Sequence, residues 1–158
     1  MNYTNPLPQS QEYMDIWFKG LLDENGELTA NGSVGKMRAR LTGCNFENRT
    51  LELVHPILPW EINPQNALHG GLISAAFDTT LSILGEYFCY PYALVTVTLN
   101  VTFCSPVFLE SENLHIESKI DFLGKSLISV SGIAWTEDKN SPVATATSTL
   151  KILSKERS

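Results

Sequence analysis

The chain has 158 residues, of which 43% are hydrophobic and 18% are charged, so it carries enough apolar material for one buried core. Its 11 basic and 17 acidic residues give a net charge of −6, which excludes the basic surface typical of nucleic-acid-binding proteins. We therefore expect a single domain spanning residues 1–158, with no nucleic-acid partner.

Cysteine content and the N-terminal sequence bear on the cellular compartment. Three widely spaced cysteines predict neither a disulfide framework nor a CxxC metal motif. Glu12 and Asp15 precede the first basic residue, Lys19, so the charge pattern of a secretion signal is missing. The longest uncharged stretch, 87–109, contains prolines and alternating threonines that favour a strand over a membrane helix. We expect a cytoplasmic protein without a membrane span.

The first third of the chain predicts a helix followed by two strands. Tyr13, Ile16, Trp17 and Leu21 recur at helical spacing and indicate a short amphipathic helix. Apolar residues then alternate with charged ones from Lys36 to Leu41 and again over 50–55, which favours two antiparallel strands. Residues 1–35 form an extension that could cap a pocket, pack on the back of the sheet or shape an oligomer.

The remaining sequence predicts a long helix and four strands. A proline-rich loop over 56–66 leads into an apolar run from Leu68 whose large residues surround the helix axis, so we expect a helix buried on most sides. Alternating residues then predict strands over 94–103, 114–122, 127–135 and 143–153, with a disordered polar tail over 155–158. The predicted class is α+β, an antiparallel sheet around a central helix.

Asp78 is the unusual residue of this helix, because an unpaired carboxylate is costly to bury among apolar neighbours. It could lie on an exposed face, or bond to a neighbouring hydroxyl such as Thr79 or Ser74. Gly70 and Gly71 open the same helix, where backbone amides lack intrahelical partners and can hold an oxyanion. The glycine pair could equally form only a tight entry to the helix. The sequence alone decides neither the setting of Asp78 nor the role of the glycine pair.

The order Asn63, His69-Gly70-Gly71 and Asp78, N-x5-H-G-G-x6-D, resembles the hotdog-fold acyl-CoA thioesterases of the phenylacetate-pathway type, in the 4-hydroxybenzoyl-CoA thioesterase superfamily. The segments TVTLNVTFCSP at 96–106 and FLGK at 122–125 are similar to that family as well. The similarity covers about 36–153. It implies a hotdog fold and hydrolysis of an acyl-CoA to the free acid and CoA.

The resemblance also implies roles for individual residues. Asp78 would be the general base or nucleophile, the Gly70 amide would polarise the thioester carbonyl, and Asn63 would place the carbonyl or the attacking water. Thr96 falls where the family often carries a hydroxyl near the carboxylate. The Lys125 side chain could contact the CoA phosphates or simply extend into solvent from a hairpin. The residues expected to bind substrate are His69, Gly71, Thr96, Gly124 and Lys125.

Helix geometry predicts the assembly independently of the resemblance. Gly70 and Asp78 are eight residues apart, which is roughly 12 Å along one helix axis. One thioester carbon cannot lie about 3 Å from both groups. A second chain must then supply one of them across a symmetric interface. We expect a homodimer, and the resemblance adds a dimer of dimers as a second possibility.

No cofactor is expected, because CoA is part of the substrate and no histidine spacing favours a metal site. Two rival functions stay open. One is a hotdog hydratase or dehydratase with His69 as its base, and the other is a non-catalytic module that binds acyl-CoA or fatty acid. The sequence does not indicate the acyl group.

Overall fold

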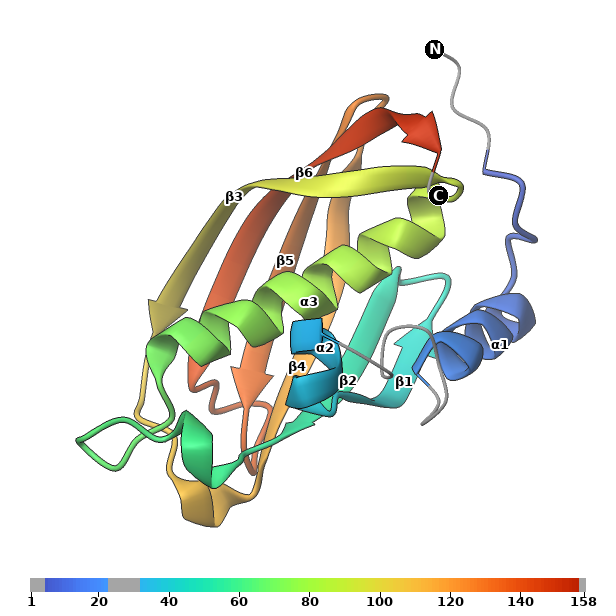
Figure 1. Ribbon diagram of the computed structural model, residues 1–158. Coiled ribbons are helices and arrows are strands. Elements are labelled where there is room, and N and C mark those ends of the chain that lie inside the picture. The colour runs from blue at the N-terminus through green and yellow to red at the C-terminus, as the bar shows by residue number, and fades with distance from the viewer. Residues whose placement is uncertain (1–4, 23–31, 157–158) are drawn as a thin grey trace.

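The computed structural model describes residues 5–22 and 32–156, which form a six-stranded antiparallel sheet curved around one long helix (Figure 1). The strand order is β1-β2-β4-β5-β6-β3. The predicted α+β hotdog architecture is confirmed. The elements are α1 (Gln11–Leu22), α2 (Gly32–Met37), β1 (Arg40–Asn45), β2 (Thr50–Pro56), η1 (Pro59–Glu61), α3 (Gly70–Cys89), β3 (Tyr92–Phe103), η2 (Leu109–Ser111), β4 (Asn113–Leu123), β5 (Leu127–Trp135) and β6 (Ala144–Glu156).

Helix α3 is the central element, and only Gly71 among its residues is exposed. Its sheet-facing side carries large apolar residues, including Phe77, Leu81 and Leu84, that are completely buried. Two glycines allow the helix to approach the strands closely. A Cβ atom on Gly85 would lie 2.8 Å from Leu94, and one on Gly132 would lie 2.9 Å from Leu81.

The close approach at Gly132 predicts a large response to a larger side chain. A Cβ there would meet Leu81, Phe77 and, at 3.2 Å, the backbone oxygen of Glu117. Because the backbone cannot yield as a flexible side chain does, we expect Gly132→Val to lower the free energy of unfolding by about 1–3 kcal/mol. Urea denaturation measures this. Gly43→Val is the control, since a Cβ at Gly43 meets nothing within 4 Å, and an equal loss there would contradict the packing explanation.

The two edges of the sheet differ. Helix α1 covers the β1 edge, where the Gln11 side chain donates to the Cys44 carbonyl at 3.0 Å and accepts from the Phe46 amide at 2.7 Å. Strand β3, at the other edge, pairs only with β6 among the described residues. An uncovered edge strand of twelve residues offers unpaired backbone groups to another chain.

The predicted N-terminal helix is confirmed as α1, and it packs at the last turns of α3. Trp17 and Phe18 contact the ring of Tyr87, with centroids 5.5 and 5.7 Å away. The preceding segment is fixed to the same residue, because the Tyr87 hydroxyl donates to the Pro8 carbonyl at 3.0 Å and Asn5 donates to the Tyr87 carbonyl at 2.8 Å. The described part of the extension therefore braces β1 and the C-terminal end of α3.

Three local predictions are wrong, each for a backbone reason. The chain over 32–37 is helical, and the first strand starts at Arg40 because Arg38 adopts a left-handed φ of 50° that no strand continues through. Strict alternation over 114–122 would put Phe122 on the buried face with Ile120, but a register shift between these two residues turns the Phe122 side chain to the outer face, where it is exposed. Strand β6 extends to Glu156, because it pairs with β3 as far as Tyr92. Residues 155 and 156 of the predicted disordered tail therefore belong to a strand, and residues 157–158 lie outside the described residues.

A buried polar contact joins α3 to β2. The His55 Nε2 atom lies 3.0 Å from the Thr80 Oγ1 atom, and the Thr80 hydroxyl donates to the Ala76 carbonyl at 2.8 Å. Since the single hydroxyl proton of Thr80 is used in that bond, the His55 Nε2 atom must be the donor in the contact between them. The neutral ring then carries its proton on Nε2 and leaves Nδ1 as an acceptor.

Burial of His55 predicts acid sensitivity. Desolvation lowers its pKa from 6.5 to about 4, so as the pH falls the unfolded chain takes up a proton before the folded chain does. The stability that neutral His55 contributes is complete above pH 6.5 and is lost between pH 6.5 and about 4. The expected loss is about 3 kcal/mol. Urea unfolding across this range measures it. His55→Phe should flatten the profile, whereas His115→Phe on the outer face should not.

Candidate functional site

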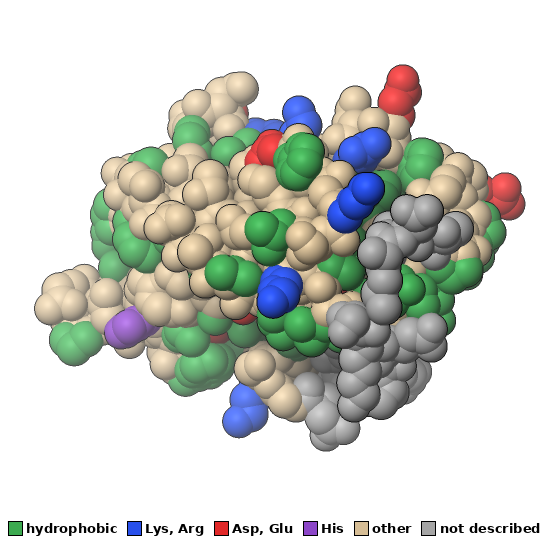
Figure 2. Space-filling model, turned by 90° about the horizontal axis from the view of Figure 1, so that it is seen from above, with side chains coloured by type: hydrophobic (Ala, Val, Ile, Leu, Met, Phe, Trp, Pro, Cys, Tyr) green, Lys and Arg blue, Asp and Glu red, His purple; other side chains and the backbone are tan. Residues whose placement is uncertain are grey.

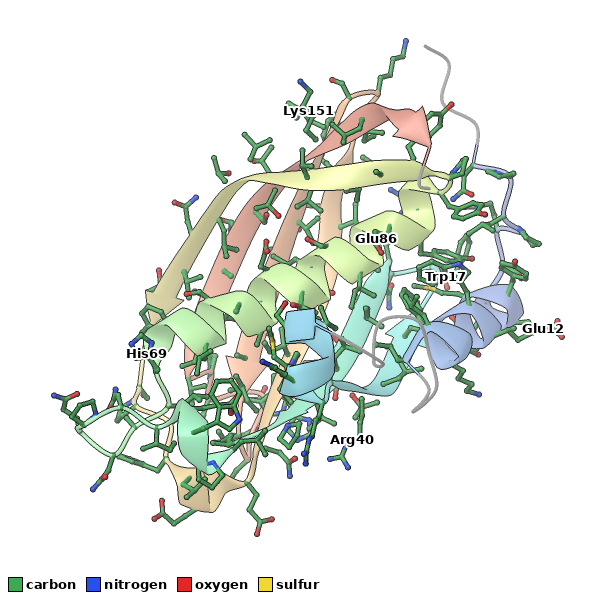
Figure 3. The ribbon with its side chains drawn as sticks, in the orientation of Figure 1. Glu12, Trp17, Arg40, His69, Glu86 and Lys151 are labelled. Atoms are coloured by element: carbon green, nitrogen blue, oxygen red, sulfur yellow. The ribbon has the colours of Figure 1, made fainter. Side chains whose placement is uncertain are left out.

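The N-terminus of α3 presents one free backbone amide. His69 caps the helix, and its Nδ1 atom accepts from the Gly71 amide at 3.0 Å. His69 lies at the N-terminal end of α3 (Figure 3). Its backbone amide donates to the Glu61 carbonyl at 2.9 Å, which fixes the turn. The Gly70 amide has no acceptor among the described residues. At the positive end of the helix dipole, Gly70 rather than Gly71 is therefore the available donor for an anionic oxygen.

The Phe103 ring, which no motif or spacing in the sequence indicated, lies against Gly70. A Cβ atom on Gly70 would be 3.2 Å from the Cζ atom of Phe103, and the ring is half exposed. Glycine therefore lets the helix start directly beside the end of β3. Alternation along β3 could have placed Phe103 on the helix side of the sheet, but not at the helix N-terminus.

Asp78 has a hydrogen-bond partner on the sheet. Its carboxylate accepts from the Thr96 hydroxyl at 2.7 Å and is half-buried on the β3 flank of α3. The alternative partner Ser74 donates instead to the Gly70 carbonyl at 2.9 Å. Asp78 therefore lies on an accessible flank, with one oxygen held by Thr96. A carboxylate in this setting can accept a proton or attack an electrophile.

Asn63 lies in the loop that leads to the helix. Its side-chain oxygen accepts from the amides of Gln65 and Ala67, at 2.9 and 3.1 Å, and its own amide donates to the Ala67 carbonyl at 2.8 Å. These bonds hold the loop in a tight turn. The side-chain nitrogen of Asn63 is the atom that remains to contact a ligand.

Gly124 and Lys125 lie far from Gly70 within one protomer. They form the β4–β5 turn, where the Gly124 amide donates to the Leu127 carbonyl at 2.9 Å and Lys125 is exposed. Through the paired strands this turn is level with Val95 on β3, whereas Gly70 lies beside Phe103. These two positions are eight residues apart on one strand, roughly 26 Å. Within one chain, Asp78 lies beside Thr96, and residues 69–71 form one turn. The Lys125 turn lies at the opposite end of β3 from Gly70.

Within 5–22 and 32–156, no group of three or more His, Cys, Asp or Glu side chains is placed to hold a metal ion. In the same residues, no helix is long and apolar enough to cross a membrane.

One protein-family profile matches the chain. The profile of the thioesterase superfamily matches residues 65–143, half of the chain and the segment that carries α3 and the Asp78–Thr96 pair. No curated protein sequence matches.

Solved structures share the fold. A phenylacetic acid degradation-related protein from Ralstonia eutropha JMP134 is 21% identical with a TM-score of 0.75, covering 85% of this chain and 98% of that chain. A thioesterase from Haemophilus influenzae is 21% identical with a TM-score of 0.71, covering 80% and 86%. A thioesterase family protein from Silicibacter pomeroyi is 19% identical with a TM-score of 0.70, covering 86% and 98%.

Proposed function

Since the chain belongs to the thioesterase superfamily, we propose that it hydrolyses an acyl-CoA thioester to the free acid and CoA. Membership supports thioester hydrolysis in general, and the resemblance to the phenylacetate-pathway type favours CoA as the thiol. The observation that carries the proposal is the position of Asp78. It is a carboxylate on an accessible flank of an apolar helix, held by Thr96 at 2.7 Å, in a chain whose same helix begins with a free amide at Gly70.

In the proposed reaction the Gly70 amide donates to the thioester oxygen and stabilises the negative charge that develops there. Asp78 then acts by one of two routes. It takes a proton from a water that attacks the carbonyl carbon, or it attacks that carbon itself, and water hydrolyses the resulting anhydride. Both routes break the carbon–sulfur bond and release CoA as the thiol after protonation of the sulfur. In this proposal the Asn63 side-chain nitrogen donates to the same oxygen or positions the water.

The distance of roughly 12 Å between Gly70 and Asp78 along one helix supports a site shared by two protomers. We propose that β3 pairs with β3 of a second copy in antiparallel orientation, so that the α3 helices of the two copies run side by side in opposite directions. Support comes from β3 itself, which has no charged residue and exposes Val95, Val97 and Phe103. Figure 2 views this side of the molecule and shows mainly uncharged and apolar side chains over its left half. Gly70 of one copy then faces Asp78 of the other.

The same pairing gives Lys125 a role. An antiparallel β3 pair places the end of β3 that contains Val95 in one copy beside Phe103 and Gly70 of the other. The β4–β5 turn is level with Val95 in its own sheet. Lys125 of the second copy therefore approaches the catalytic end of the first, where its ammonium group can attract the CoA phosphates.

A panel of acyl-CoAs from acetyl to long-chain and aryl esters, assayed for thiol release, tests the function. Turnover of any of them supports hydrolysis and identifies the acyl class. Saturable binding of acyl-CoA without thiol release from any ester would contradict it and favour the non-catalytic binding module. A hydratase is less compatible with the site, because Nδ1 of His69 already accepts from the Gly71 amide.

A further inference from the structure

The most exposed large apolar side chain in the described part of the chain lies at the β4–β5 turn. It is Phe122, which is 64% exposed on the outer face of the sheet. Its ring lies beside Gly124, where a Cβ atom would be only 2.9 Å from the ring atom Cε1. Leu127, after the turn, is 43% exposed on the same face, since its neighbour Ile128 is completely buried on the other. The turn thus presents an aromatic ring beside an aliphatic side chain, a surface on which a planar group can stack.

Two lysines flank these apolar side chains. Lys125 is exposed in the turn itself, and Lys151 is exposed on β6, directly opposite Leu127. The next residue of β6 is bound to the turn, because the Ile152 amide donates to the Ser126 carbonyl at 2.9 Å. Figure 3 shows Lys151 at the end of the sheet where this turn lies. We name Phe122, Lys125, Leu127 and Lys151 the turn patch.

Few other charges lie around the turn patch. Strands β3, β5 and β6 together contain only three charged residues, which are Lys151, Lys155 and Glu156. Asp121, which precedes Phe122, accepts from the Ser131 hydroxyl at 3.0 Å and is held toward the middle of the sheet. The lysines of the turn patch therefore keep a positive potential that no paired carboxylate cancels within 4 Å among the described residues.

The spacing within the turn patch suits a nucleotide. Phe122 is opposite Ser129 of β5, and Ser129 is opposite Thr149 of β6, two residues before Lys151. Phe122 and Lys151 are thus two strands and two residues apart, roughly 12 Å between their backbones. Their long side chains shorten this gap, and hydroxyl groups line the face between them. A base on the ring would place its phosphates toward the lysines.

We propose that the turn patch binds the adenine nucleotide end of CoA. The adenine stacks on Phe122 beside Leu127, and the phosphates bind Lys151 and Lys125. The inference rests on the proposed function, which makes CoA the thiol of the substrate. In the proposed dimer this turn of one copy approaches the catalytic end of the other. The turn patch of one protomer therefore holds the nucleotide of a CoA whose thioester lies at Gly70 of the second protomer.

Binding of adenosine 3′,5′-bisphosphate, an analogue of the nucleotide end of CoA, tests the turn patch without any reaction. We expect calorimetry to detect saturable binding to the wild type that weakens as salt is added. Phe122→Ala should raise Kd at least about fivefold through loss of stacking, and Lys151→Gln about two- to fivefold. Ile16→Ala and Lys19→Gln, at exposed positions of α1, are the matched controls and should leave Kd unchanged. An absence of binding, or an unchanged Kd in Phe122→Ala, would overturn the proposal.

A comparison of two substrates tests whether the bound nucleotide belongs to CoA. Acyl-pantetheine carries the same thioester as acyl-CoA but ends before the nucleotide. Phe122→Ala should raise KM for acyl-CoA at least about fivefold, with kcat unchanged, and leave KM for acyl-pantetheine at the wild-type value. An unchanged KM for acyl-CoA, in a variant that no longer binds the bisphosphate, would assign the turn patch to a free nucleotide and reject the proposal. If the wild type hydrolyses no thioester, the proposed function fails, and competition between CoA and the bisphosphate for binding then decides the turn patch by itself.

A second copy of the chain is the other occupant to be tested. Sedimentation velocity of the wild type and Phe122→Ala should give the same species, because a nucleotide site is not needed for assembly. Dissociation of Phe122→Ala into smaller species, with binding of the bisphosphate unchanged, would assign the turn patch to a contact between copies and overturn the proposal.

Discussion

Replacing Asp78 by Asn is expected to lower kcat by about 10²–10⁴-fold, the usual contribution of a general base. The amide has the shape of the carboxylate, and its oxygen can still accept from the Thr96 hydroxyl that now lies 2.7 Å from Asp78. It has no proton affinity near neutral pH and is not a nucleophile. Thiol release should therefore be lost while the far-UV spectrum and the melting temperature stay close to those of the wild type.

Asp121→Asn is the matched control for this change. Asp121 likewise accepts from a hydroxyl, that of Ser131 at 3.0 Å, but it is exposed and lies on the outer side of the sheet. The same substitution thus removes the same charge from a similar hydrogen bond away from α3. Activity should be unchanged within a factor of about two. Equal losses in the two variants, or a kcat of Asp78→Asn close to that of the wild type, would remove Asp78 from the proposed mechanism.

For α3, and for the presence and order of β3 to β6, the predictions that came from local spacing agree with the structure. The helical repeat sets the relative positions of residues along one helix. The glycine pair at the start of α3 and Asp78 in its middle could therefore be located from the sequence. Period-two alternation located β3 to β6 for the same reason. These local rules suffice for the order of elements and for one half of the candidate site.

Contacts between distant segments could not be derived in this way. Thr96 meets Asp78 because of the packing of α3 on β3, and a register shift directly after Thr96 decides which later residues, including Phe103, face the helix. The left-handed backbone at Arg38 likewise breaks an alternation that reads as a strand. The resemblance, rather than periodicity, suggested Thr96. Nothing local indicated that His55 is buried with one nitrogen unpaired.

Mixing two inactive variants is expected to restore activity, because the proposed site takes Gly70 from one protomer and Asp78 from the other. The partner of Asp78→Asn in this experiment is Gly70→Pro, which removes the amide proton. Proline suits the first position of a helix, and the preceding residue has the extended backbone that proline requires, with ψ 126° at His69. Each homodimer should have no detectable turnover.

In a mixed dimer one site combines the intact Gly70 of the Asp78→Asn chain with the intact Asp78 of the Gly70→Pro chain, and the other site contains both changes. Equal amounts of the two chains, unfolded and refolded together, should give about one half heterodimer and so about one quarter of wild-type activity. Gly70→Ala keeps the amide and serves as the control for crowding by Phe103, so it should stay active. A mixture that remains inactive although heterodimers form would contradict the shared site. It would also contradict the action of Gly70 and Asp78 on one carbonyl, because roughly 12 Å separates these two residues on one helix.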